Sequence, residues 1–252
     1  MKRLTILLTA VFCLACAGLP GVEEPVSVAS VAEPADPAIP DNPTVAILYF
    51  DYEGEDKELG SLKKGLAQMI ITDMAGNAGY DVVERDRLED ILKELELSQS
   101  DKIDPKKAVE IGKLVGADLT IMGSYFEAMG AFRVDTRIVD TATSIITCGV
   151  GETGKRDDFL GIQSRLSDKL SVAVLSDGDD CTSPLPSKPP PAPALERKTL
   201  KRLDIGTAAT FSQALEAKDS DDPAKAKALL DQVVKAEPEF KLAADELATL
   251  MM

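Results

Sequence analysis

A glycine-rich stretch carries residue types that bind nucleotide phosphates. It runs from Gly149 to Arg156 and reads Gly-Val-Gly-Glu-Thr-Gly-Lys-Arg. A phosphate loop needs glycines for close backbone approach, a Lys for the β- and γ-phosphates, and a following hydroxyl residue for Mg²⁺. Here Arg156 takes the place of the hydroxyl residue, and the stretch follows the last strand of an expected meander. We therefore interpret it as a glycine-rich turn and expect no nucleotide to bind.

Other catalytic chemistry is limited because the chain contains no His. That absence excludes His-based acid–base catalysis, Ser-His-Asp and Cys-His nucleophiles, and His metal sites. The acidic pairs fall on expected helix faces, where solvated charge is the ordinary interpretation. We expect no catalytic residue, no cofactor and no metal site, and we predict that the protein is not an enzyme.

Two of the four cysteines, Cys148 and Cys181, lie far from the N-terminus. An even pair of cysteines in an oxidising compartment favours a disulfide between them. Two free thiols are the alternative.

The first seventeen residues have the pattern of a secretory signal peptide. Two basic residues precede an apolar run over residues 4–15, which is too short to span a bilayer because a span needs about twenty residues. The end of the run resembles a bacterial lipobox that would leave Cys16 lipidated, although Cys13 stands where Leu is usual. Cleavage after Ala17 is the alternative and would give a soluble periplasmic protein. The chain is therefore expected to be exported.

Two proline-rich stretches divide the remaining chain. Residues 18–42 carry five prolines without helical or strand periodicity, which predicts a disordered, acidic tether. Residues 179–200 hold six prolines and predict a stiff linker. We therefore expect a folded domain over residues 43–178 and a small helical segment over residues 201–252.

The spacing of apolar residues predicts the order of elements in the folded domain. Residues 44–50 form a continuous apolar run, which is typical of a strand buried on both faces. The same reasoning indicates an α+β fold, an α/β sandwich with a mixed sheet, followed by a small all-α segment. Strands are predicted over 44–50, 80–84, 119–126, 132–139 and 144–149, and helices over 61–77, 86–97, 104–116, 157–175, 208–217, 223–235 and 239–250.

The charge of the chain limits its partners. It has 43 acidic residues against 28 basic ones, a formal net charge of −15. Such a protein is repelled by nucleic acid and by anionic lipid surfaces. We expect no nucleic-acid partner.

A series of short motifs in a fixed order covers residues 44–175. They are Val45-Ala-Ile-Leu-Tyr-Phe50, Tyr80-Asp-Val-Val-Glu-Arg85 leading into residues 88–97, residues 109–118 with Gly116-Ala-Asp118, Ile121-Met-Gly-Ser124, and Arg137-Ile-Val-Asp140. Together they resemble the curli secretion-channel (CsgG-like) family. The resemblance implies an anticodon-binding-like fold and an outer-membrane lipoprotein that faces the periplasm, anchored through lipid at Cys16.

The chain departs from the channel members of that family in its length. Those members add two long transmembrane hairpins per subunit, which need about forty to fifty residues at 9–11 residues per strand. Only 31 residues run from Leu119 to Gly149, and three core strands already use them. The resemblance therefore implies an accessory or assembly module without pore hairpins, which binds envelope proteins or copies of itself. A tethered lipoprotein regulator of a cell-wall (peptidoglycan) synthase, a class that resembles the same fold, is the alternative.

Glu84 and Arg85 match a recurrent Glu-Arg motif of this family. The resemblance implies a buried ion pair at a subunit contact. The alternative is an ordinary helix start at which Asp86 serves as the N-cap.

The last fifty residues resemble a single tetratricopeptide repeat followed by a capping helix. One repeat cannot bury a core alone, so it should dock on the central domain, on a partner or on another copy. A generic helical hairpin is the alternative. The matching positions are Ala214, Ala226, Leu230, Val233 and Pro238.

Overall fold

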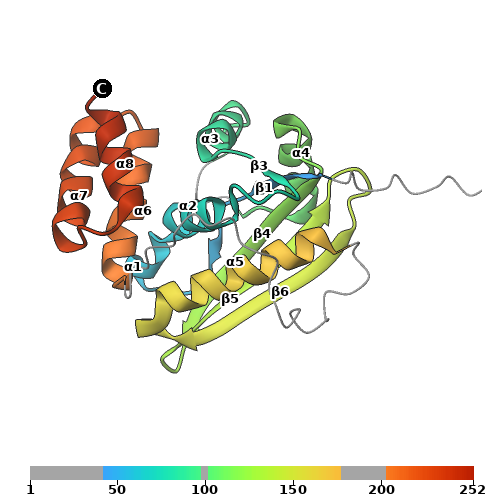
Figure 1. Ribbon diagram of the computed structural model, residues 1–252, viewed down its shortest axis with the longest axis horizontal. Coiled ribbons are helices and arrows are strands. Elements are labelled where there is room, and N and C mark those ends of the chain that lie inside the picture. The colour runs from blue at the N-terminus through green and yellow to red at the C-terminus, as the bar shows by residue number, and fades with distance from the viewer. Residues whose placement is uncertain (1–41, 98–101, 177–202) are drawn as a thin grey trace, which may run out of the picture. The chain divides into compact units, whose positions relative to one another are not determined.

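The computed structural model describes residues 42–97, 102–176 and 203–252 (Figure 1). The predicted signal peptide with Cys16, nearly all of the tether, and the proline-rich linker with Cys181 lie outside these residues. Among the described residues, no helix is both long enough and apolar enough to cross a membrane.

The centre of the fold is a mixed sheet with the strand order β3-β1-β4-β5-β6, and β2 pairs with β4 beyond the end of β1. Strand β1 runs parallel to both of its neighbours, whereas β4, β5 and β6 form an antiparallel meander. The predicted α+β class with a mixed sheet is therefore confirmed. The strands are β1 (Thr44–Ile47), β2 (Asp51–Tyr52), β3 (Asp81–Val82), β4 (Leu119–Ala128), β5 (Ala131–Asp140) and β6 (Ile146–Lys155).

The helices form where apolar residues recur at helical spacing between good start and stop residues. Helix α4 shows this best, because Asp104 accepts a hydrogen bond from the backbone N–H of Lys107 and Gly116 closes the helix at a φ of 72°. The helices are α1 (Lys57–Gly60), α2 (Lys63–Met74), α3 (Arg85–Glu94), α4 (Pro105–Val115), α5 (Phe159–Leu175, after a 3₁₀ turn at Arg156–Asp158), α6 (Ile205–Asp219), α7 (Pro223–Ala236) and α8 (Lys241–Leu250).

The two faces of the sheet are covered by different helices. Helices α2 and α5 contact each other and pack on one face, where Phe132 of β5 meets Phe159 of α5 edge to face. Helix α4 packs on the opposite face, where Gly112 lies against Thr120 of β4. Further along β5, Arg133 and Arg137 on that opposite face are exposed and Asp135 between them is half-buried, as the alternation of charged and apolar residues along this strand indicates.

The glycine-rich stretch forms the second half of β6 and pairs with β5 as far as Lys155. Our prediction of a turn is therefore wrong. Packing explains why Gly154 is a glycine, because a Cβ there would lie 2.9 Å from the side chain of Ile162 on α5. Glycine there lets α5 approach the sheet closely.

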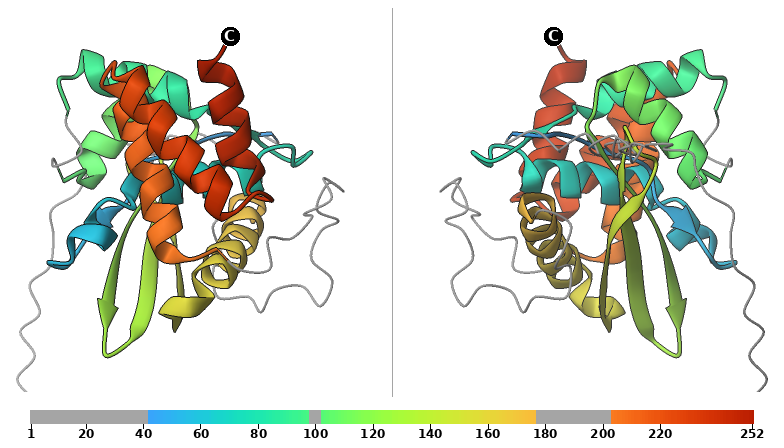
Figure 2. Two further views of the ribbon diagram at one scale, coloured as in Figure 1. Left: turned by 90° about the vertical axis from the view of Figure 1, so that its left-hand side faces the viewer. Right: turned by 90° about the vertical axis from the view of Figure 1, so that its right-hand side faces the viewer.

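Helices α6, α7 and α8 pack against one another, and α6 also packs on α1 and α2 (Figure 2). The apolar core is continuous across this contact, since Leu66 of α2 and Phe211 of α6 belong to the same buried cluster. The docking predicted for an isolated helical repeat therefore occurs on the central domain, and all of the described residues fall within one compact unit.

Candidate interaction site

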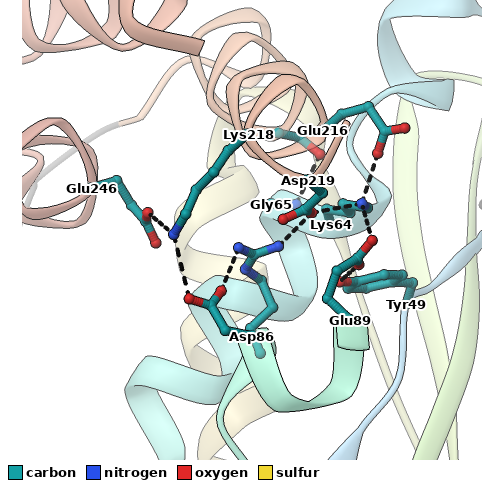
Figure 3. Close-up of polar contacts among 11 residues, drawn as sticks. Tyr49, Lys64, Gly65, Asp86, Glu89, Glu216, Lys218, Asp219 and Glu246 are labelled. Atoms are coloured by element: carbon teal, nitrogen blue, oxygen red, sulfur yellow. Dashed lines mark hydrogen bonds and ion pairs between the residues drawn. The ribbon is translucent and has the colours of Figure 1, made fainter. Parts of the chain in front are cut away.

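The densest polar contact in the described structure joins the central domain to α6. It is made by the first turns of α2 and α3 and the C-terminal half of α6 (Figure 3). We call it the α2–α6 junction and define it by six residues: Lys64, Gly65, Arg85, Glu89, Ser212 and Asp219.

Helix α2 lacks a cap of its own. The side chain of Leu62 at its N-cap accepts no hydrogen bond, so the first N–H groups of the helix have no acceptor within the helix. One of them is satisfied from α6, because the backbone N–H of Gly65 donates to Oγ of Ser212 at 2.8 Å. A Cβ at Gly65 would stand 2.9 Å from Cβ of Ser212 and 3.2 Å from the carbonyl oxygen of Ala208. Glycine is needed here because α6 supplies the missing cap at very short range.

Lys64 is 2% exposed and is surrounded by acidic groups. Its Nζ lies 2.7 Å from Asp219, 2.7 Å from Glu216 and 3.2 Å from Glu89. Tyr49 completes the enclosure, since its hydroxyl donates to Glu89 and Nζ of Lys64 lies 5.2 Å from the centre of its ring. Burial opposes the charge of Lys64, but hydrogen bonds to Asp219 and Glu216 outweigh burial and raise its pKa. A buried ammonium group is stable only with such partners.

Arg85 is 3% exposed and shares an acceptor with Lys64. Its Nη1 donates to Oδ2 of Asp219 at 2.6 Å, and its Nη2 donates to Oδ1 of Asp86 at 2.6 Å. Burial alone would raise the pKa of Asp219, but Arg85 and Lys64 hold the pKa of this carboxyl below its ordinary value. One carboxylate of α6 therefore neutralises buried cations from two helices of the central domain. Within the described residues, Nε of Arg85 is buried without a hydrogen-bond partner.

A second, more exposed set of ion pairs extends the contact to α8. Nζ of Lys218 lies 3.4 Å from Asp86 and 2.8 Å from Glu246. Hydrogen bonding to Glu246 outweighs partial burial and raises the pKa of Lys218. These pairs tie α3, α6 and α8 together at the rim of the α2–α6 junction.

The two residues of the predicted Glu-Arg motif have different roles in the structure. Arg85 does form a buried ion pair, but with Asp219 of the same chain, so its role in a subunit contact stays a prediction. Glu84 is the N-cap residue of α3, and its side chain makes no capping hydrogen bond. Our alternative, in which Asp86 caps the helix, is wrong because Asp86 lies within the first turn and pairs with Arg85.

Asp219, the central acceptor of the junction, was not predicted from the sequence. The signal available in the sequence was its position, since Asp219 ends α6. A carboxylate at a helix C-terminus is unfavourable beside the negative end of the helix dipole. An acid placed there indicates a cationic partner elsewhere in the fold.

The glycine-rich stretch is not arranged around a ligand. Its backbone pairs with β5, and the Arg156 guanidinium that follows it contacts Glu58, Glu127 and Asp56. In the part of the chain that the structure describes, no group of three metal-ligating side chains is placed to hold an ion.

Cys148 is buried in β6 and is disulfide-bonded. Cys181 lies outside the described residues, and the pairing of these two cysteines stays a prediction.

The fold and the α2–α6 junction define an α+β domain with a helical segment fixed to it by buried ion pairs. The family model of the curli production assembly/transport component CsgG matches residues 37–128. This match confirms, over that segment, the resemblance inferred from the motifs. No curated protein shows significant sequence similarity to the chain.

Several solved structures are similar to parts of the chain. The C-terminal domain of LpoB from Salmonella enterica is 16% identical, with a TM-score of 0.37, and the match covers 46% of this chain and 85% of that one. Lipoprotein GNA1162 from Neisseria meningitidis is 13% identical, with a TM-score of 0.36 and coverage of 44% and 79%. A PelC dodecamer from Paraburkholderia phytofirmans is 14% identical, with a TM-score of 0.32 and coverage of 55% and 89%.

Proposed function

We propose that this protein is a non-catalytic lipoprotein of the cell envelope. It acts as an accessory or assembly module at the periplasmic side of the outer membrane and binds other envelope proteins or copies of itself. The observation that carries the proposal is the match of residues 37–128 to the CsgG family, whose name describes assembly and transport. The predicted signal peptide and the lipobox at Cys16 support the same location.

The strand connections support a module without pore hairpins of its own. Strands β4 and β5 are joined by a tight turn at Met129 and Gly130, and their pairing runs in register from that turn to the other end. Both strands of this hairpin belong to the same mixed sheet. The meander therefore leaves no additional length for membrane-crossing strands between β4 and β5.

The α2–α6 junction supports binding rather than catalysis. Its charged groups satisfy one another inside the fold, which is the arrangement of a structural ion-pair network. It holds α6–α8 on the central domain, so that the outward sides of α7 and α8 are presented to partners. The net charge of −15 favours neutral or basic protein surfaces as those partners.

Lipidation is tested by metabolic labelling with a palmitate analogue, followed by membrane fractionation. We expect label in the wild type and in the matched Cys13→Ser variant, and none in Cys16→Ser. The Cys16→Ser protein should be recovered without detergent. An unlabelled, fully soluble wild type would contradict the lipoprotein and support cleavage after Ala17.

Assembly is tested by the mass of the full-length protein, extracted from native membranes in mild detergent and measured by light scattering. A discrete assembly of several chains, or a defined complex with another envelope protein, would support the module. A free monomer that crosslinks in cells only to a peptidoglycan synthase would contradict the assembly role and support the regulator.

A further inference from the structure

We propose that α6–α8 of one copy dock on α2 and α3 of a second copy, through the contacts that these helices make within one chain here. This inference rests on the proposed function and deepens it, because it names the surface by which copies of an assembly module hold one another.

The surface beneath α6 is incomplete without an occupant of defined chemistry. Lys64 and Arg85 are buried cations, and the N–H of Gly65 has its acceptor, Ser212, on α6 rather than on the central domain. An occupant has to bring a hydroxyl for Gly65 and a carboxylate that reaches both cations.

Helix α6 meets these requirements from one side. Ser212, Glu216 and Asp219 are spaced by four and three residues, which places them on one helix face. The same helix of any second copy carries the same three groups at the same spacing. The contacts that these groups make within one chain are therefore the contacts that α6 of a second copy would make.

The chain between α5 and α6 is much longer than docking within one chain requires. Leu175 at the end of α5 packs on Gly79, which follows α2, whereas Gly206 near the start of α6 lies beside Glu58, which precedes α2. The connection within one chain therefore has to run back about the length of α2, roughly 18 Å for a helix of twelve residues. The 27 residues from 176 to 202 are rich in proline and would reach about 80 Å if extended. This reach exceeds the requirement several-fold.

The segment docks mainly through one helix. Of its three helices, α6 makes most of the contacts with the central domain, whereas α7 packs on α6 and α8 packs on α7. A long connection lowers the effective concentration of the segment at its own docking surface towards the millimolar range. A second copy held nearby on the same membrane competes with this effective concentration for the docking surface. Exchange of a segment between identical chains needs no new contact.

The test uses the half-buried Ser61 and the exposed Gln213 at the rim of the junction, where Nε2 of Gln213 donates to Oγ of Ser61 at 3.1 Å. Full-length chains carrying Ser61→Cys and a small tag are co-produced with chains carrying Gln213→Cys and a larger tag. Native membranes are then treated with a short bis-maleimide. We expect a covalent product that contains both tags. A chain with both substitutions measures docking within one chain.

The matched control replaces Gln213→Cys by Lys227→Cys. Lys227 is exposed on α7, where it pairs with Asp231, so its product with Ser61→Cys measures random collision. Adding Asp219→Asn to the Gln213→Cys chain should lower the product between chains by about tenfold or more, because the shared acceptor of two buried cations is lost.

A product between chains no greater than that of the Lys227→Cys control, at about 1 mM protein as well as on membranes, would overturn the exchange. If light scattering still shows a discrete assembly, the proposed function stands and only the exchange fails. If the protein is also a free monomer without envelope partners, both fail.

Discussion

At the scale of single residues, Asp219 is the carboxylate that two buried cations share. Its carboxylate lies within 2.7 Å of a Lys and an Arg that are both nearly inaccessible to water. Replacing a buried ion pair by apolar groups is often harmless, whereas removing one partner leaves an uncompensated buried charge. The stability of the junction is therefore far more sensitive to the loss of Asp219 than its short side chain suggests.

We predict that Asp219→Asn lowers the free energy of unfolding by about 1.5–3 kcal/mol, because Lys64 and Arg85 lose the carboxylate that they share and keep only Glu216, Glu89 and Asp86 as charged partners. The matched control is Asp231→Asn, which removes an exposed pair with Lys227 and should cost less than about 0.5 kcal/mol. Urea unfolding followed by circular dichroism measures both values. Equal losses would show that the buried pairs contribute no more than a surface pair.

The pKa shifts of the junction predict a broad stability plateau. The folded pKa of Asp219 lies below its ordinary value of 3.8, so its contribution is present above pH 3.8 and is lost as pH falls through the folded pKa. The folded pKa of Lys64 lies above 10.5, so its contribution is complete below pH 10.5 and is lost as pH rises through the folded pKa.

Unfolding free energies measured from pH 2 to 6 (about the range in which carboxylates titrate) check the acid limb. In Asp219→Asn the fall in stability below pH 3.8 should be clearly shallower than in the wild type, while Asp231→Asn should keep the wild-type slope. A wild-type slope in Asp219→Asn would mean that Asp219 does not stabilise the fold through its charge.

At the scale of helices and strands, the main finding is that α2 borrows its N-terminal cap from α6. The contact requires both a hydroxyl at Ser212 and the absence of a side chain at Gly65. Glycine in a helix ordinarily costs about 1 kcal/mol relative to Ala, so its presence here is compensated by the close packing of α6.

We predict that Gly65→Ala destabilises the protein by about 1–3 kcal/mol although Ala favours helix, because the new methyl group displaces α6. Gly149→Ala is the control, since the nearest atom to its Cβ is a carbonyl oxygen 3.8 Å away. The free energy of unfolding of that variant should lie within about 0.5 kcal/mol of the wild-type value, as is usual for surface substitutions. Hydrogen exchange at the amides of α6 should accelerate only in Gly65→Ala. Slower exchange there would contradict the close approach.

Periodicity and caps predicted most elements of the fold but not the contacts between distant ones. The helix predicted over 104–116 is α4, and the strand predicted over 132–139 lies within β5. The second half of β6 was missed because its glycines favour a turn locally, whereas pairing with β5 and packing under α5 decide its conformation. Arg85 was identified as one side of an ion pair, but its partner lies 134 residues away in the sequence.

At the scale of the whole molecule, the C-terminal helices pack on the central domain and share its core. The shared core and the buried cations both require α6 to be in place. Residues 43–178 and 201–252 are therefore separate in the sequence, but their side chains pack in one continuous core.

We predict that the protein stays associated after its linker is cut. A specific protease site placed within residues 183–193 lies downstream of Cys181, so no expected disulfide joins the two products. The products should co-elute at micromolar concentration because the continuous core and the ion pairs hold α6 in place. A chain ending at residue 182, which keeps Cys181, should be less stable than the cut complex, as judged by thermal unfolding. Separation of the two products on size exclusion would contradict a shared core.

The borrowed cap of α2 also sets the order in which the molecule can reach its native state. Gly65 and Ser212 are separated by 147 residues, and Lys64 and Asp219 by 155. Contacts between residues so far apart in the sequence form late in folding. The entropy cost of closing the intervening loop comes before these contacts can stabilise the fold. Synthesis from the N-terminus produces α6 after helices α1–α5. Before α6 is present, the first turn of α2 lacks its cap and two cations lack the carboxylate of Asp219. The protein is therefore most exposed to aggregation and proteolysis in the interval before α6 packs.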